Sequence, residues 1–99
     1  MSVRVVADFY VRQDAVDEFL AAATALRSET HAKDAGCVAY DLFRDKADPL
    51  HLTMIEEWDD HASLDTHLAS EHFQRLFPFF QDAGDPDKTG AVTVYEPAL

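Results

Sequence analysis

Four segments of the chain alternate apolar and polar residues, and this alternation constrains the fold more than any other feature. A period of two is typical of a β-strand that buries one face. The stretch between the first and second segments, and that between the third and fourth, repeat apolar residues every three or four positions, as an amphipathic helix does. The predicted strands cover residues 3–11, 37–44, 50–58 and 91–96.

The first helix is predicted over about residues 15–31. Asp14 is placed to cap it, because a carboxylate at the N-cap accepts hydrogen bonds from free backbone amides. Asp17 and Glu18 then stand in the first turn, where the helix dipole favours negative charge. The face expected to pack on the sheet carries Val16, Phe19, Leu20, Ala23, Leu26 and Thr30.

The second helical stretch is predicted to have an interruption. Asp59 or Asp60 is expected to cap its first part, and Ser70 to restart the helix. Pro78 is expected to kink or end the second part, because its ring removes a backbone donor and crowds the preceding turn. A polar loop over residues 82–90 precedes the last strand. The core-facing positions are Leu64, Leu68, Phe73, Leu76, Phe77 and Phe80.

These elements follow the order β-α-β-β-α-β. That order predicts an α+β, ferredoxin-like fold, a four-stranded antiparallel sheet with two helices on one face. With 99 residues there is room for one core, so residues 1–99 are predicted to form a single domain. The strands over residues 3–11 and 37–44 are apolar on both faces. Because a face in water should be polar, we expect a homodimer whose sheets pack face to face.

The balance of charge limits the classes of partner. The chain has 19 Asp and Glu against 8 Lys and Arg, a net charge of −11. Nucleic acids and anionic membranes are held through clustered cations, so neither is an expected partner. Cys37 is the only cysteine, and the start of the sequence lacks the pattern of a secretory signal. No apolar stretch approaches the roughly 20 residues that span a bilayer. We therefore expect a cytoplasmic protein.

An acid, an indole and an imidazole are predicted to meet near the third strand. Glu56 and Trp58 share one strand face with Met54, and His67 lies in the helix close to Leu64, which must face the sheet. We expect these groups to converge on a partly apolar cavity, with the ring nitrogens and the carboxyl as its hydrogen-bonding groups. The alternative is purely structural: the acid and the histidine satisfy each other or a helix end beside a buried Trp58.

Metal binding and thiol catalysis are not expected. No two histidines have the i,i+4 spacing of a zinc-binding helix, since His67 and His72 are five residues apart and His61 and His67 six. Cys37 follows a turn glycine at the start of a strand, with no sequence neighbour that would lower its pKa. It is predicted to be a buried structural thiol rather than a nucleophile.

Several motifs together resemble a known family. They are residues 34–42 (DAGCVAYDL), residues 56–60 (EEWDD), Leu64 with His67, and His72 with Phe73. They are similar to the patterns E-x-G-C-x-x-Y, E-x-W-x-D, L-x-x-H and H-F of the antibiotic biosynthesis monooxygenase (ABM) domain. The resemblance covers nearly the whole chain and implies a dimeric α+β barrel. It implies a reaction less specifically, because the family includes quinol monooxygenases, polyketide-tailoring oxygenases and enzymes that degrade a quorum-sensing signal.

Two branches of that family differ from this chain at particular positions. Members that oxygenate polycyclic phenols often carry an asparagine four residues before the Trp, where this chain has Met54. Haem-degrading relatives use an Asn on the first strand, a Trp on the second helix and a downstream His, and the His is the iron ligand. The corresponding positions here are Asp8, His67 and about Phe77. The missing ligand disfavours haem degradation.

The leading hypothesis is a cofactor-independent monooxygenase of a small electron-rich aromatic, a hydroquinone or a polyketide-like phenol, with molecular oxygen as co-substrate. Such an enzyme needs an apolar slot, a base and a donor to the developing oxyanion. His67 or His72 is the candidate base, Glu56 the acid that orients it, and Trp58 a wall and N–H donor. His72 has a second interpretation, as a helix-start residue that fixes the loop. The candidate substrate-binding residues are Phe9, Tyr40, Met54, Phe73 and Phe77.

Two alternatives belong to other classes. An isomerase or degrading enzyme for a small carbonyl signal compound would use the same acid and imidazole to move a proton. A non-catalytic dimeric binding module would use the same residues only as core. The volume of the cavity tests the binding module, since a space below about 100 Å³ could hold no ligand of the usual pocket size of roughly 300 Å³ or more.

Overall fold

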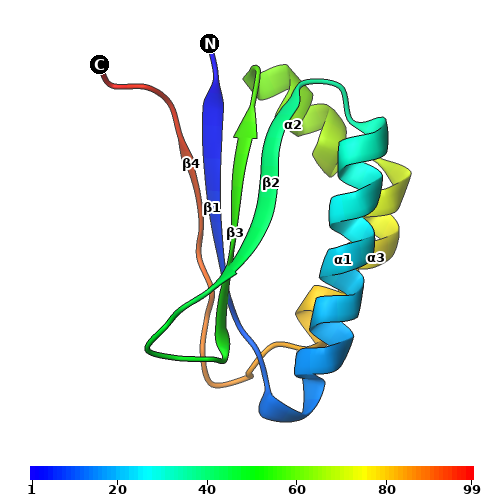
Figure 1. Ribbon diagram of the computed structural model, residues 1–99, viewed down its shortest axis with the longest axis vertical. Helices are drawn as coiled ribbons and strands as arrows, with labels where there is room; N and C mark the ends of the chain where they lie inside the picture. Colours follow the sequence, from blue (N-terminus) through cyan, green and yellow to red (C-terminus); the bar gives the residue numbers. More distant parts are fainter.

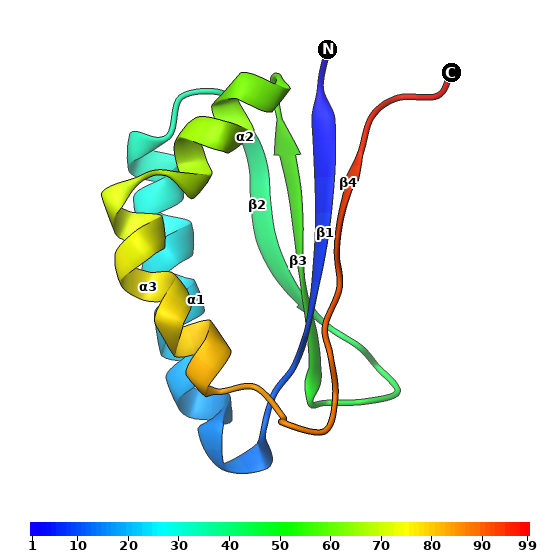
Figure 2. The ribbon, with the colours of Figure 1, turned by 180° about the vertical axis from the view of Figure 1, so that it is seen from behind.

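The computed structural model describes residues 1–99 and has two layers, a sheet and a layer of helices on one of its faces (Figure 1). The strands are β1 (Val3–Tyr10), β2 (Cys37–Arg44), β3 (His51–Trp58) and β4 (Val92–Tyr95). Their order in the sheet is β2-β3-β1-β4, and every neighbouring pair is antiparallel. The predicted α+β, ferredoxin-like order is confirmed. Strand β4 forms one edge of the sheet beside β1 (Figure 2).

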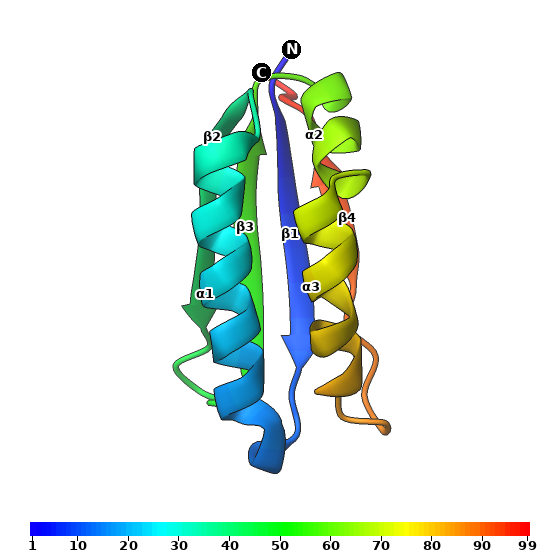
Figure 3. The same ribbon diagram turned by 90° about the vertical axis from the view of Figure 1, so that its right-hand side faces the viewer.

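The helical layer contains three α-helices and one short 3-10 turn. They are η1 (Gln13–Ala15), α1 (Val16–Lys33), α2 (His61–Leu68) and α3 (Glu71–Asp82). Helix α1 lies beside α2 and α3 over the same face of the sheet (Figure 3). The predicted interruption is confirmed, because Asp60 accepts a hydrogen bond from the Ser63 amide at the start of α2, and Ser70 accepts one from the Phe73 amide at the start of α3.

Two details of the helices differ from the sequence prediction. Asp14 does not cap α1: it lies inside the 3-10 turn, its carboxylate accepts from Arg12, and the N-cap position is held by Ala15 without a side-chain bond. Pro78 does not end α3, which continues to Asp82. Pro78 is exposed, so the carbonyl that loses its partner there faces water, while Phe80 beyond it is buried.

A β-bulge changes which side chains of β2 face the helices. Under strict alternation Cys37 would share a face with Ala39, but the pairing with β3 shifts between these two residues. Val38 is the extra residue, so Cys37 pairs with Trp58 and packs against the core on the same side as Tyr40. One inserted residue reverses the parity of everything before it.

The core fills the space between the sheet and the helices. It comprises 17 buried hydrophobic residues, of which Trp58, Phe19 and Leu26 are fully enclosed. The outer face of the sheet mixes apolar and charged groups: Ile55 is exposed there, while Arg4 pairs with Glu57 at 3.2 Å. None of the helices has the length and apolar character to cross a membrane.

Candidate functional site

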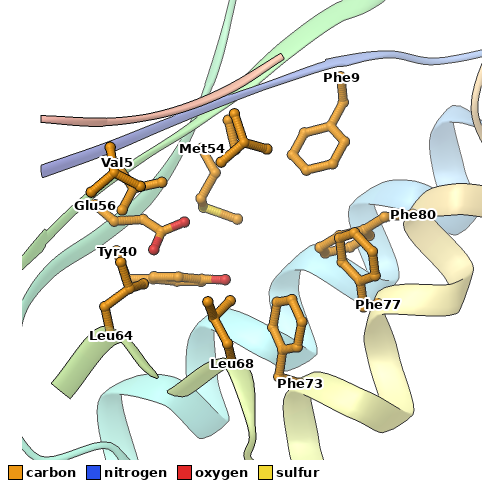
Figure 4. A pocket seen from close by; sticks show the side chains of 13 residues that line it. Val5, Phe9, Tyr40, Met54, Glu56, Leu64, Leu68, Phe73, Phe77 and Phe80 are labelled. Carbon is orange, nitrogen blue, oxygen red and sulfur yellow. The ribbon is translucent and has the colours of Figure 1, made fainter. Parts of the chain in front are cut away.

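A cavity of about 190 Å³ lies between the sheet and helices α2 and α3 (Figure 4). Twelve of its 13 lining residues are hydrophobic. All four strands contribute to its floor, and Leu64, Leu68 and the aromatic residues of α3 form its roof. The cavity exceeds the volume of about 100 Å³ below which no ligand was expected, so the space is more than a packing defect.

The five side chains predicted to hold a substrate all line this cavity. They are Phe9, Tyr40, Met54, Phe73 and Phe77, which come from β1, β2, β3 and α3. The rings of Phe73 and Phe77 stack with their centroids 4.9 Å apart. Strand parity places Phe9 and Met54 here, and helical spacing places the two phenylalanines of α3.

Glu56 is the one ionisable carboxyl in the wall of the cavity. Its residue is 7% exposed, and Oε1 accepts a hydrogen bond from Trp58 Nε1 at 2.9 Å. Burial raises its pKa to about 7, against the opposing effect of the indole hydrogen bond. No lysine or arginine lines the cavity to hold the negative charge. This carboxyl therefore exchanges its proton near neutral pH, as a general base must.

Tyr40 supplies the second polar group of the cavity. Its residue is buried, yet the hydroxyl points into the cavity (Figure 4), and Tyr40 is the cross-strand partner of Glu56. Burial, and secondarily the nearby Glu56 charge, hold the pKa of the phenol well above its usual range. The hydroxyl consequently stays protonated at physiological pH and is available as a hydrogen-bond donor.

Trp58, His67 and His72 lie behind the wall rather than in it, since none of them lines the cavity. The indole of Trp58 is fully buried, and its ring centroid is 4.7 Å from that of His67. Tyr40 lines the cavity and contacts both Trp58 and His67, with its ring edge-on to each of theirs. Trp58 thus reaches the cavity only through the hydrogen bond to Glu56.

The two histidines form a separate cluster with Asp34. Asp34 Oδ2 lies 2.6 Å from His67 Nδ1 and 2.9 Å from His72 Nε2, and all three side chains are buried. Burial lowers the pKa of His67, although the hydrogen bond to Asp34 opposes that shift. Glu56 does not orient a histidine in this structure, because it bonds to Trp58 and both histidines bond to Asp34.

Asp34, His67 and His72 are also the residues best placed for a metal ion, since their ligand atoms lie within 4.8 Å of one another. Both imidazoles are directed at the same carboxylate oxygen, while the second ring nitrogen of His67, Nε2, is buried without a hydrogen-bond partner. The spacing of the histidines does not indicate this group, because His67 and His72 are five residues apart on different helices and Asp34 lies far from both in sequence. Its available signal in the sequence is an acid at the end of a helix, two residues before the turn glycine Gly36.

Comparison with known proteins identifies the class. The sequence matches the family "Antibiotic biosynthesis monooxygenase" (ABM) over residues 2–78. The chain belongs to this family, as the motif resemblance indicated.

Particular relatives share both sequence and structure with this chain. It is 33% identical over 64 residues to "Putative monooxygenase YcnE" of Bacillus subtilis (strain 168), a match that spans 65% of this chain and 66% of that protein. A conserved protein from Methanosarcina mazei Go1 superimposes with a TM-score of 0.89 at 37% identity, covering 96% of this chain and 91% of the other. An antibiotic biosynthesis monooxygenase superimposes with a TM-score of 0.88 at 36% identity, covering 98% and 99%. These relatives support a monooxygenase-like function without defining a substrate.

Proposed function

We propose that this protein is a cofactor-independent monooxygenase that acts on a small electron-rich phenol such as a hydroquinone. The observation that carries the proposal is a carboxyl with a pKa of about 7 in an otherwise apolar cavity that also holds the hydroxyl of its cross-strand partner Tyr40. Membership of the ABM family and the similarity to a protein named as a monooxygenase support the same reaction class.

Glu56 is the proposed general base, in place of the histidines favoured by the sequence. A base must reach the proton it removes, directly or through one water. The Glu56 carboxyl is in the cavity wall, whereas His67 and His72 lie behind Tyr40 and Phe73 and bond to Asp34. Trp58 is the proposed positioning residue, because its N–H fixes one oxygen of Glu56 and leaves the other for the substrate.

The proposed reaction balances without a bound redox group. Glu56 takes one phenolic proton, and the Tyr40 hydroxyl stabilises the anion by donating a hydrogen bond. The anion reduces O2 by one electron, and the resulting radical pair recombines into a ring hydroperoxide. Loss of water then leaves a hydroxylated quinone. One oxygen atom enters the ring and the other leaves as water, and the substrate supplies all four electrons. The apolar walls keep bulk water away from the radicals.

The test is oxygen consumption by the purified protein with monocyclic hydroquinones in metal-free buffer. We expect consumption above the rate of autoxidation, with one hydroxylated quinone formed per O2 consumed. Trp58→Phe should lower that rate, because Glu56 then loses the donor that fixes it. Rates equal to the buffer blank for every compound would overturn the proposal and favour the isomerase or the binding module.

We further propose that two copies pair through the outer faces of their sheets in the cytoplasm. The unpaired Cys37 suits a reducing compartment, and the net charge of −11 supports neither nucleic acid nor anionic membrane as a partner. The outer face exposes Phe43, Ile55 and Tyr95. Two-fold pairing of that face would cover all three residues in both copies.

Ile55→Lys tests the pairing. Two lysines facing each other across a two-fold interface repel and lose solvation, so we expect a dimeric mass for the unmodified protein and a monomeric mass for this variant in light scattering. Phe79→Lys is the control, because Phe79 is exposed on α3, away from the sheet. A monomeric mass for the unmodified protein, or dissociation by the control alone, would contradict the sheet-face dimer.

A further inference from the structure

The lining of the cavity changes from polar to apolar across the sheet, from strands β2 and β3 to the β4 edge. Its polar atoms belong to Tyr40 on β2 and Glu56 on β3, at the buried side. On β4 its floor is made by Val92 and Val94, whose residues are 68% and 47% exposed. Leu68 on α2 is also exposed, so the mouth lies between α2 and the β4 edge. Neighbouring strands are about 4.8 Å apart, so roughly 10 Å of apolar floor separates Glu56 from the mouth.

The volume limits the number of rings. A protein cavity of about 150 Å³ holds one benzene, and this one measures about 190 Å³. The space suits one ring with a short substituent.

The charge of the wall excludes anionic ligands. Glu56 is the one charged group that lines the cavity, and no cation faces it from the sheet or the helices. The whole chain carries −11. A carboxylate on the ligand would face the negative charge of Glu56 across the cavity and gain no counter-ion from its walls.

Building on the proposed function, we infer that the substrate is an uncharged single-ring phenol with one short alkyl substituent. Its reacting hydroxyl lies at Glu56 and Tyr40, and its substituent points along the apolar floor to Val92 and Val94 at the β4 edge. The cavity therefore selects ligands that have a hydroxyl at one end and an uncharged alkyl group at the other.

Binding under argon tests this inference separately from turnover. Calorimetry with phenol, 4-methylphenol, 4-ethylphenol and 4-propylphenol should show Kd falling about fourfold per added carbon. 3-(4-Hydroxyphenyl)propionate, which replaces the terminal methyl of 4-propylphenol by a carboxylate, should bind about tenfold more weakly, because its charge is repelled by Glu56. Trp58 is the only tryptophan and bonds to Glu56, so a change in its fluorescence places the ligand in this cavity.

Val94→Arg should reverse the discrimination by placing a cation at the mouth. We expect 3-(4-hydroxyphenyl)propionate to bind this variant at least tenfold more tightly than the unmodified protein. Thr93→Arg is the matched control, because it adds the same charge one residue away on the opposite face of β4. Equal gains in both variants would indicate only long-range attraction and would overturn the orientation.

The outcomes separate the inference from the proposed function. A flat alkyl series, equal binding of the carboxylate, or no binding of any phenol would overturn the inference even if oxygen were consumed. The expected binding pattern without oxygen consumption would leave the ligand class standing and remove the monooxygenase.

Discussion

Glu56→Gln is expected to lower kcat/KM for a hydroquinone by about 10²- to 10⁴-fold, the usual contribution of a general base. Glutamine keeps the size of the side chain and can still accept the Trp58 N–H, but it cannot take a proton. The unmodified protein should lose activity about tenfold per pH unit below its pKa of about 7, because the base is then protonated. The residual activity of the variant should lack this pH dependence. Steady-state oxygen uptake between pH 5 and pH 9 measures both effects.

The control is Glu57→Gln, the next residue along β3. Glu57 faces the outer side of the sheet and pairs with Arg4, so its loss should leave turnover and its pH profile unchanged. His67→Gln distinguishes the rival base. If His67→Gln abolished turnover while Glu56→Gln kept it, the base would be the histidine.

The stability of Glu56→Gln shows whether its loss of activity comes from unfolding. The pKa of Glu56 is about 7 in the folded protein against an ordinary 4.5, so the folded state holds a proton that the unfolded state releases. Stability is therefore lost as pH rises from about 4.5 to about 7, by up to about 3 kcal/mol. Glutamine has no such penalty, so the variant should match the unmodified protein near pH 4 and be more stable near pH 8. Urea unfolding at the two values measures the difference.

Local periodicity predicted the strands, the helices and the slot, because each depends on which face of an element is apolar. Met54 and Glu56 point to the cavity as their shared parity requires, and Phe73 and Phe77 line it one helical turn apart. The bulge at Val38 could not be predicted from the alternation of apolar and polar residues, because that pattern does not show which residue is left unpaired in the neighbouring strand.

The role of the histidines could not be predicted because it depends on a partner distant in sequence. Leu64 and Leu68 were expected to face the sheet, with His67 beside them, and both leucines line the cavity on that side of α2. In the structure His67 instead turns to Asp34, which ends α1 thirty-three residues earlier. The spacing of residues within α2 predicts on which face of the helix His67 lies. It does not predict that the end of α1, with Asp34, packs against that face.

Asp34→Ala is expected to destabilise the fold by about 3 kcal/mol or more, because it leaves the buried donors of His67 and His72 without an acceptor. Asp34 joins the end of α1 to both α2 and α3, so the loss should shift the urea midpoint of the whole domain. Asp41→Ala is the control: its ion pair with Arg27 at 2.9 Å is exposed and should contribute less than about 1 kcal/mol.

Asp34→Asn then separates stability from chemistry. Its amide oxygen still accepts a hydrogen bond, so we expect part of the stability to return, together with the full turnover of the unmodified protein, because the cavity does not include the cluster. A folded Asp34→Asn protein without turnover would show that the histidines take part in the reaction. A loss below 1 kcal/mol for Asp34→Ala would show instead that they find other partners.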